Sequence, residues 1–276
     1  MTVPTRTLPS GDEMPLLGFG TYDIPPEETT AAVRTALEAG YRHVDCAEGY
    51  GNETEVGEAI ADYDRDELFL TSKVVPRHLD YESVLTACRD SLDRLDTDSL
   101  DLYLIHWPNP AVSLRETLSA MGRLVEEGLV RNVGVSNFNT YQLRFARHLS
   151  DVPIATNQVE FHPWFQQPEL CAYADETDVQ LTAAAPLART RVFDEPVVQE
   201  LAEAYDRTPA QIVLRWQVQR GVATIPRSTT PTHIESNLAV TDWELAEDDV
   251  DRIDAIDRRE RQYMVEPTHP RYGISG

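Results

Sequence analysis

Lysine is nearly absent from this sequence. The chain of 276 residues carries 24 Lys plus Arg, and Lys73 is the one lysine among them. Asp plus Glu total 47, which gives a formal net charge of −23. A field this negative repels nucleic acid and anionic membranes, so we expect neither as a partner. Because arginine serves at every other cationic position, the lone lysine indicates a place where a compact, titratable ammonium is needed.

Long apolar runs and a cysteine framework are missing as well. No run approaches the roughly 18 residues of a membrane helix, and the first residues show no signal-peptide pattern. Three cysteines at wide spacing argue against disulfides and for a reducing, cytoplasmic location. The carboxylates are spread along the chain, which predicts an acidic surface like that of proteins from salt-loving organisms. We expect folding and activity to need molar salt; a melting series in KCl tests this, and unchanged or falling stability would contradict it.

Short β-rich runs alternate with longer amphipathic stretches, and no linker or repeat divides the chain. Strands are expected at residues 16–18, 41–45, 68–74, 100–106, 132–135, 154–160, 180–184 and 223–225. Helices are expected at residues 28–39, 54–62, 81–95, 113–127, 140–149, 168–176, 196–205, 208–219, 231–239 and 246–256. Thr140 is expected to cap one of these helices and Pro231 to open another.

This alternation predicts the α/β class and a single domain over residues 1–276. The length suits one (β/α)8 (TIM) barrel of about 250 residues, preceded by an N-terminal β-hairpin that turns at Gly11. A doubly wound parallel sheet is the alternative. Both architectures place functional residues at the carboxyl ends of their strands.

Polar residues end three consecutive expected strands. Asp45 ends one, with Tyr50 in the glycine-containing loop that follows; Lys73 ends the next, and His106 the third. Taken singly, such residues are commonly turn, packing or rim residues. Together, a buried Lys–Asp pair beside a tyrosine would favour the phenolate, so that Tyr50 could donate a proton near neutral pH. His106 would orient a carbonyl oxygen by a hydrogen bond.

Several stretches, in matching order and spacing, resemble the signatures of the aldo-keto reductase superfamily. They are LGFGT at 17–21, GYRHVDCA at 40–47, YGNE at 50–53, LIHWP at 104–108, GVSNF at 134–138, and IPRS at 225–228 followed by Asn237. The resemblance implies a (β/α)8 barrel that binds NADPH, with NADH possible, and reduces a small-molecule carbonyl compound. It also implies that the catalytic residues are Asp45, Tyr50, Lys73 and His106, with Tyr50 as general acid.

The resemblance further implies a cofactor site with a nicotinamide end and a phosphate end. Its residues would be Gly20, Thr21, Tyr22, Asp45, Ser136, Asn137, Gln158, Pro186, Leu187, Arg227, Ser228, Thr230, His233 and Asn237. Ala184 stands where the family usually has an aromatic that stacks on the nicotinamide, so we expect looser cofactor binding. Arg227 replaces a usual lysine and His233 a frequent arginine, which predicts a preference for NADPH with reduced discrimination against NADH.

Other cofactor and metal motifs are missing. The segment from Gly18 to Gly20 lacks the third glycine of a dinucleotide-binding turn and does not open a helix, which argues against a Rossmann site. The sequence has no Walker loop, no nucleophile elbow and no histidines at metal-ligand spacing, so we expect no metal.

The substrate end is less specific. Tyr22, Trp107 and Phe138 are expected to form an apolar pocket, and Val75 would leave one wall open where some relatives place a tryptophan. This favours small aldehydes, ketoaldehydes or sugar-derived ketones. We expect a monomer or weak oligomer. Two other functions stay open: an NADPH-sensing regulatory subunit of the same fold, and a barrel lyase that uses Lys73 as a Schiff-base nucleophile.

Overall fold

The structure, a computed structural model, describes residues 3–262. Its strands are β1 (Thr5–Thr7), β2 (Glu13–Pro15), β3 (Phe19–Gly20), β4 (His43–Asp45), β5 (Phe69–Val74), β6 (Leu100–Ile105), β7 (Val130–Ser136), β8 (Ile154–Glu160), β9 (Gln180–Ala184) and β10 (Ala223–Thr224). Its α-helices are α1 (Pro26–Ala39), α2 (Glu53–Ile60), α3 (Tyr81–Leu95), α4 (Leu114–Glu126), α5 (Thr140–Leu149), α6 (Pro168–Thr177), α7 (Pro196–Tyr205), α8 (Pro209–Gln219), α9 (Pro231–Leu238) and α10 (Glu247–Asp254). Short 3₁₀ helices are η1 (Glu48–Tyr50), η2 (Arg65–Glu67), η3 (Pro76–His78) and η4 (Ala188–Asp194).

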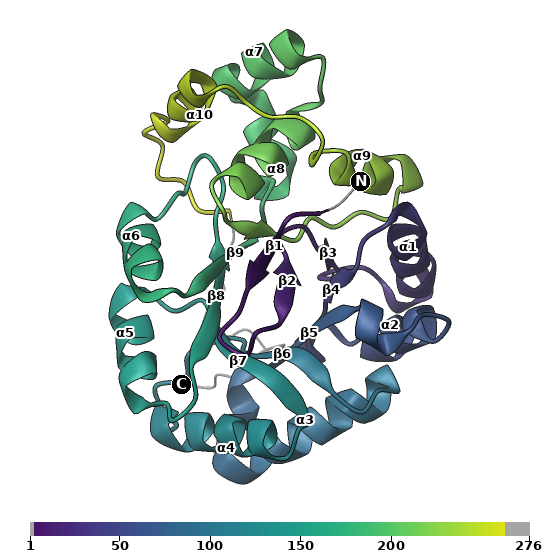
Figure 1. Cartoon of the computed structure of the whole chain (residues 1–276), viewed down its shortest axis with the longest axis vertical. Coiled ribbons are helices and arrows are strands. Elements are labelled where there is room, and N and C mark those ends of the chain that lie inside the picture. The colour runs from purple at the N-terminus through teal and green to yellow at the C-terminus, as the bar shows by residue number, and fades with distance from the viewer. Residues whose placement is uncertain (1–2, 263–276) are drawn as a thin grey trace.

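Strands β3 to β10 lie side by side in chain order as a parallel sheet that helices surround (Figure 1). The sheet closes between its first and last strands. Leu17 bridges to Thr224, and the Gly18 amide donates to the Thr224 carbonyl at 2.9 Å. Two residues further along each segment, the Gly20 amide donates to the Pro226 carbonyl at 3.0 Å. The predicted (β/α)8 barrel is therefore confirmed, and the doubly wound alternative is wrong.

Most expected elements occur with shifts of one or two residues, and β8, β9, α3, α5 and α7 have the expected bounds. The first barrel strand is misplaced in the prediction, because residues 16–18 bond across the closure to Thr224 and the ladder with β4 begins only at Phe19. The predicted cap at Thr140 is also wrong. Asn139 caps α5, and its side chain and that of Gln142 each accept from the other's backbone N–H. Pro231 opens α9 as expected.

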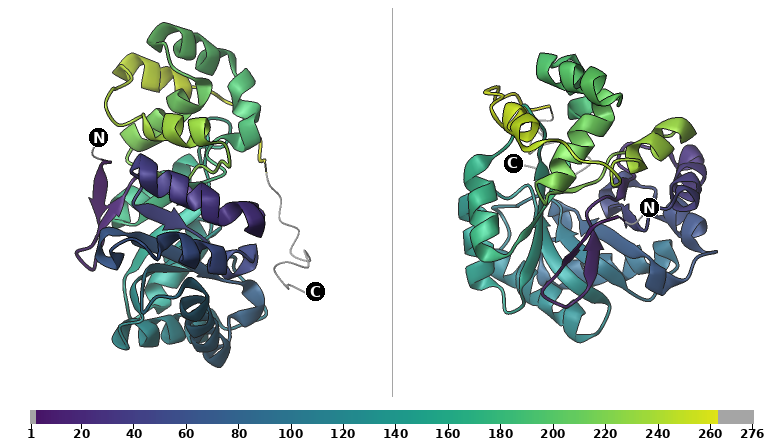
Figure 2. Two further views of the ribbon diagram at one scale, coloured as in Figure 1. Left: turned by 90° about the vertical axis from the view of Figure 1, so that its right-hand side faces the viewer. Right: turned by 45° about the horizontal axis from the view of Figure 1, so that its top comes forward.

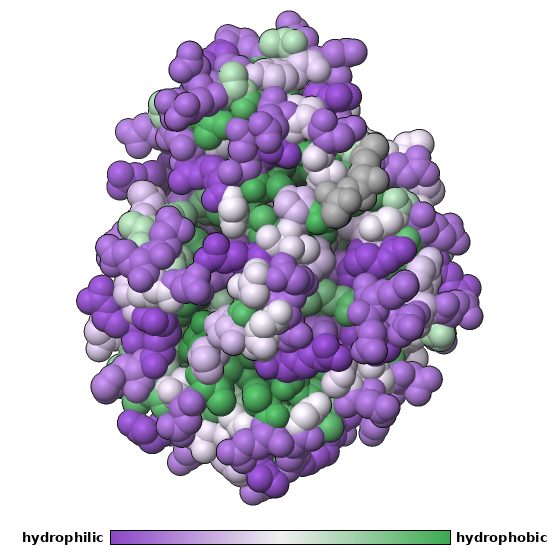
Figure 3. Space-filling model, in the orientation of Figure 1, coloured by the Kyte–Doolittle hydropathy of each residue, from purple (hydrophilic) through white to green (hydrophobic). Residues whose placement is uncertain are grey.

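The hairpin β1–β2 lies across the amino end of the barrel (Figures 1 and 2). Its apolar side chains Leu8, Met14 and Leu16 join Leu102 and Leu104 in a cluster inside the barrel, whereas a larger apolar core fills the space between strands and helices. On this face, hydrophilic side chains predominate and apolar ones emerge between the hairpin and the surrounding helices (Figure 3). The hairpin thus closes the amino end of the barrel with hydrophobic side chains. The carboxyl end, where barrels of this kind carry their active sites, is not covered by it.

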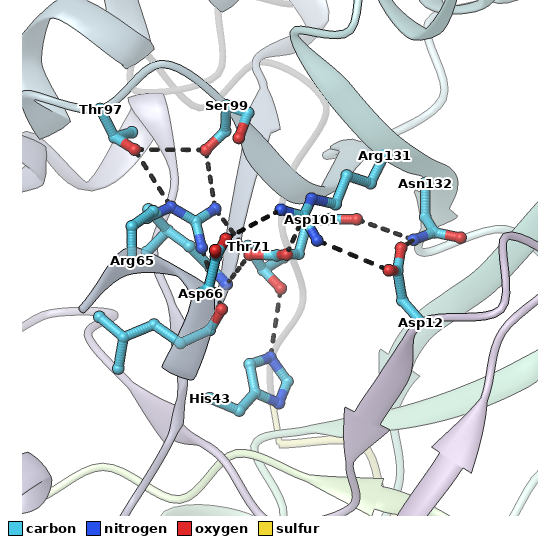
Figure 4. A network of polar contacts seen from close by, with 12 residues as sticks. Asp12, His43, Arg65, Asp66, Thr71, Thr97, Ser99, Asp101, Arg131 and Asn132 are labelled. Atoms are coloured by element: carbon cyan, nitrogen blue, oxygen red, sulfur yellow. Dashed lines mark hydrogen bonds and ion pairs between the residues drawn. The ribbon is translucent and has the colours of Figure 1, made fainter.

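A polar network runs from the hairpin turn across the neighbouring strands (Figure 4). Arg65 donates to Asp101 Oδ2 at 2.6 Å, and the same oxygen accepts from the Leu70 amide at 2.8 Å. Asn132 links the Asp101 carbonyl, at 3.1 Å, to the Asp12 carboxylate of the hairpin turn, at 2.9 Å. These hydrogen bonds connect the hairpin turn to the three neighbouring strands β5, β6 and β7.

None of the helices within residues 3–262 combines the length and apolar character that crossing a membrane requires. Cys46 and Cys88 are buried, Cys171 is partly buried, and none of the three is in a disulfide.

Candidate active site

Lys73 lies near the carboxyl end of the barrel, one residue before the end of its strand. It comes from β5, and its side chain is fully buried. Its Nζ donates to Asp45 Oδ1 at 2.6 Å, to the Cys46 carbonyl at 2.9 Å and to Tyr50 Oη at 3.1 Å. An ammonium has three hydrogens. These three acceptors therefore account for all of its donors.

Tyr50 ends the short helix η1, in the loop between β4 and α2. Gly51 follows at φ 71°, a left-handed conformation that glycine adopts without strain. The buried Asn52 amide then donates to the carbonyls of Thr21 and Ile24, at 2.9 and 3.2 Å. These bonds tie the loop that carries Tyr50 to the loop that follows β3.

His106 directly follows β6 and faces the same phenol. Its ring lies edge-on to that of Tyr50, with centroids 5.4 Å apart. Its backbone amide donates to the Val74 carbonyl at 3.0 Å, which holds it beside the end of β5. Burial, with the positive charge of Lys73 adding to it, lowers the pKa of His106 well below that of a free histidine. The imidazole is therefore neutral at ordinary pH and keeps one N–H donor.

Amide and hydroxyl groups suited to a carboxamide gather next to these residues. Asn137 Nδ2 donates to the His106 carbonyl at 2.9 Å and to Ser136 Oγ at 3.0 Å. Ser136 Oγ donates to the Gln158 carbonyl at 2.8 Å. Gln158 Nε2 reaches across the barrel to Asp45 Oδ2 at 2.7 Å, a contact that the sequence did not predict. Both oxygens of Asp45 are thus bound to donors.

The loop after β3 approaches the site closely. A Cβ at Gly20 would lie 2.7 Å from the Ile225 carbonyl oxygen, so this position requires glycine. Thr21 is buried, and both its amide and its hydroxyl donate to the Asp45 carbonyl, at 3.0 and 3.1 Å. Tyr22 is exposed, and its ring lies edge-on to that of Tyr50, with the ring centroids 5.2 Å apart.

The segment after β9 is strained. Ala184 ends the strand and is partly exposed, so no aromatic ring projects from this position. Positive φ values follow at Ala185 (46°), Ala188 (48°) and Thr190 (68°), where non-glycine residues are disfavoured, most of all a β-branched one. Pro186 and Leu187 lie within this segment. The Pro186 carbonyl accepts from Gln217 at 3.1 Å, and the Leu187 carbonyl accepts from the Thr190 amide at 2.8 Å.

The expected phosphate-end residues lie on the β10–α9 segment. Arg227 is exposed and pairs with Asp23 Oδ2 at 3.3 Å. Ser228 Oγ accepts from the Thr230 amide at 3.0 Å, and Thr230 precedes α9 without a side-chain cap of its own. His233 is exposed on α9, and Asn237 is buried on it.

The expected substrate residues separate into two groups. Tyr22 and Trp107 are exposed or partly exposed next to Tyr50 and His106. Phe138 is 2% exposed and belongs to the core between barrel and helices, so we leave it out of the proposed substrate pocket. Val75 is fully buried, just beyond the strand that carries Lys73.

A cavity of about 520 Å³ lies away from these residues. It opens between the starts of α5 and α6 and the segment after α10, where Trp164, Pro168 and Arg258 line it. None of its described lining residues is Asp45, Tyr50, Lys73 or His106, so its size is not evidence about the reaction. Within residues 3–262 no group of three or more His, Cys, Asp or Glu side chains is arranged to hold a metal.

Three residues near the site were not predicted from the sequence: Glu48, Asn52 and Asp23. Glu48 Oε2 accepts from the Val75 amide at 3.1 Å, and its Oε1 lies 2.6 Å from His78 Nδ1, so it joins the Tyr50 loop to the loop after β5. Asn52 stands within the YGNE stretch, which was the available signal for it. Glu48 and Asp23 act through contacts between loops, for which the sequence carries no pattern.

Comparisons with known proteins agree with this geometry. A family model described as "Aldo/keto reductase family" matches residues 16–258. "Uncharacterized oxidoreductase YtbE" of Bacillus subtilis (strain 168) is 42% identical over 262 residues, which cover 92% of this chain and 93% of that protein. "Aldo-keto reductase family 1 member A1" of Mus musculus is 39% identical over 301 residues, covering 96% and 92%.

Solved structures are similar over almost the full length. An aldo/keto reductase from Brucella melitensis superposes with a TM-score of 0.88 at 42% identity, covering 93% of this chain and 100% of that one. MGS-M4, an aldo-keto reductase from a Medee basin deep-sea metagenome library, gives 0.92 at 36% identity, covering 96% and 99%. This chain therefore belongs to the aldo/keto reductase family and is an NAD(P)H-dependent enzyme that reduces small-molecule carbonyl compounds.

Proposed function

We propose that this enzyme reduces small aldehydes, ketoaldehydes or sugar-derived ketones to alcohols, with NADPH preferred over NADH and Tyr50 as the proton donor. The observation that supports this most is the set of contacts made by Lys73, which donates to Asp45, the Cys46 carbonyl and Tyr50 Oη. An ammonium cannot accept a hydrogen bond, so the phenol hydrogen of Tyr50 is not given to Lys73. That hydrogen is the one to be donated to substrate.

Bound nicotinamide supplies a hydride to the carbonyl carbon, so the enzyme's own groups must supply a proton to the oxygen. Tyr50 donates this proton as negative charge develops on the oxygen. Lys73 stabilises the phenolate that results, and Asp45 holds the buried ammonium in place through its contact at 2.6 Å. His106 is neutral and donates its N–H to the same oxygen, which polarises the carbonyl and orients it toward Tyr50.

The residues beside this centre fit the cofactor by their chemistry. Ser136, Asn137 and Gln158 offer a hydroxyl and two amides within hydrogen-bond distance of one another or of Asp45, which suits a carboxamide. At the other end, Arg227 offers a planar fork of donors for a 2′-phosphate, and the uncapped start of α9 at Thr230 offers backbone N–H groups.

The substrate class rests on the residues around Tyr50. Tyr22, whose ring contacts that of Tyr50, and the partly exposed Trp107, which follows His106 in the chain, provide aromatic surface, and the small, buried Val75 contributes no bulk. A short substrate with a reactive carbonyl fits this setting, and hydroxyl groups on it would remain near solvent. A substrate of this kind gains affinity mainly from apolar contact with the two rings.

The two other functions are less well supported. A Schiff-base mechanism needs an unprotonated Lys73, whereas this lysine is bound to a carboxylate at 2.6 Å. A purely regulatory role gives no reason for Asp45, Tyr50, Lys73 and His106 to lie together. It remains an outcome of the experiment that follows.

Loss of reduced-nicotinamide absorbance, measured with NADPH and NADH against a panel of carbonyl compounds at low and high KCl, tests the proposal. We expect turnover with short aldehydes, ketoaldehydes or sugar ketones, faster with NADPH than with NADH. Tight NADPH binding without turnover on any compound would favour the regulatory subunit. Borohydride trapping of a substrate on Lys73 without NADPH turnover would favour the lyase.

A further inference from the structure

An acidic residue faces the cation that is proposed to bind the cofactor's 2′-phosphate. Asp23 Oδ2 lies 3.3 Å from Arg227 NH2, and the side chains are 57% and 46% exposed. The pair joins residues 204 apart in the sequence. Within residues 3–262, neither Asp23 nor Arg227 forms another ion pair.

The fold makes this contact a consequence of barrel closure. The Gly20 amide donates to the Pro226 carbonyl at 3.0 Å, which places the loops after β3 and β10 side by side. Asp23 comes three residues after Gly20, and Arg227 comes directly after Pro226. Asp23 also has φ 59°, a left-handed conformation that Asp and Asn tolerate better than other side chains.

The same loop reaches the catalytic residues on its other side, through Tyr22 and its contact with Tyr50 at 5.2 Å. Asp23 is therefore held at the edge of the cofactor-binding region and not in a remote part of the surface. A phosphate that binds Arg227 carries about two negative charges and must approach this carboxylate. The phosphate must displace the Asp23 carboxylate from the guanidinium, and the carboxylate repels the phosphate.

We propose that Asp23 determines cofactor selectivity: it neutralises Arg227 and weakens binding of NADPH relative to NADH. The inference rests on the proposed role of Arg227 as the phosphate ligand. NADH has no 2′-phosphate, so Asp23 affects its binding little. The groups are exposed, and salt therefore screens the effect: the Debye length falls from about 10 Å at 0.1 M to about 3 Å at 1 M.

Dissociation constants for NADPH and NADH, measured by protein fluorescence without substrate, test this. Asp23→Asn removes the charge and keeps a residue that tolerates the left-handed backbone. At low salt we expect the variant to bind NADPH about fivefold more tightly, with NADH affinity changed by less than about twofold. The gain should shrink as KCl approaches about 1 M.

Two further variants separate the possible failures. Glu27→Gln removes one exposed carboxylate from the first turn of α1, so it matches the change in net charge. An equal gain in NADPH affinity from Glu27→Gln would overturn the inference, because the effect would then be one of overall charge.

Arg227→Leu should weaken the binding of NADPH and leave the binding of NADH unchanged. If Arg227→Leu does so but Asp23→Asn leaves selectivity unchanged, the inference is wrong and the phosphate site stands; if neither variant changes selectivity, both are wrong.

Discussion

At the amino end of the barrel Arg65 pairs with Asp101, and at the carboxyl end Lys73 pairs with Asp45; each N–O distance is 2.6 Å. The two aspartates are almost fully buried. The difference lies in what else the cations bind. Arg65 also donates to Thr97 Oγ1 and to the carbonyls of residues 68 and 99, none of which titrates (Figure 4).

Lys73 gives its third hydrogen to a side chain that can itself lose a proton. Its bonds to Asp45 and to the Cys46 carbonyl fix the ammonium, and the third bond, to Tyr50, reaches a short turn between β4 and α2. The comparison indicates that a buried ion pair contributes to stability when the other hydrogen bonds of its cation go to backbone carbonyls and to side chains that do not titrate. It serves chemistry when one donor is directed at a titratable group.

Exchange of the two cations is the strongest way to break this comparison. Lys73→Met should lower kcat by about 10²–10⁴-fold, because the phenolate of Tyr50 loses its charge partner, while NADPH affinity stays close to that of wild type. Lys73→Arg should also be severely impaired, since a planar guanidinium cannot replace a compact ammonium among three acceptors. Steady-state kinetics and fluorescence titration measure both.

The control is the reverse exchange at the amino end. Arg65→Lys should lower the melting temperature and leave kcat per folded molecule unchanged. Near-normal activity in Lys73→Arg would mean that the lone lysine is retained for another reason than the tuning of Tyr50.

The amino-end network should contribute mainly to stability. Asp101→Asn leaves Arg65 without its carboxylate in a largely buried setting, and we expect the free energy of unfolding to fall by about 3 kcal/mol. Denaturant titration checks this. Asp178→Asn is the matched control, because it breaks an Arg–Asp pair with Arg6 at the exposed hairpin edge and should change stability little. Equal losses from both variants would show that burial of the pair does not matter.

The smallest expected effect concerns the buried histidines at the two ends. Burial lowers the pKa of His43, which contacts the Pro15 carbonyl and Thr71 Oγ1, as it lowers that of His106. Below about pH 6.5, His43 and His106 become protonated in the unfolded chain but stay neutral in the folded chain. Stability therefore falls as pH falls below that value, by up to about 1.4 kcal/mol per pH unit for each group.

His43→Gln should flatten this acid-side slope without changing kcat, whereas substitution of His106 should change both. Unfolding measured between pH 7 and pH 5 gives the slopes. His148→Gln, at an exposed position on α5, is the control and should leave the slope as in wild type. An unchanged slope in His43→Gln would contradict the account of its burial.

The sequence predicts the architecture well because the fold depends on local patterns. The expected strands at 41–45, 68–74 and 100–106 each carry a titratable residue at or next to the carboxyl end, which places Asp45, Lys73 and His106 at neighbouring strand ends. The capping error at Thr140 was avoidable, since Asn139 followed three residues later by Gln142 is a capping-box pattern. The position of β3 was not predictable in this way, because it depends on where Thr224 meets Leu17 at the closure.

Contacts across the barrel lie beyond local patterns. Gln158 donates to Asp45 over 113 positions of sequence, and Arg227 meets Asp23 over 204. Neither partner shows a spacing that indicates the other. Phe138 belongs to a matched stretch, yet its side chain turns into the core, since neighbouring positions along the chain can face opposite sides.

Tyr50→Phe tests the central claim most directly, because it removes one oxygen and keeps the ring that packs against Tyr22 and His106. The measurement is kcat for NADPH oxidation with the best carbonyl substrate, taken alongside the melting temperature. The account predicts a fall in kcat of about 10²–10⁴-fold with NADPH affinity and melting temperature nearly unchanged. A variant that retains kcat within about threefold of wild type would show that another group donates the proton.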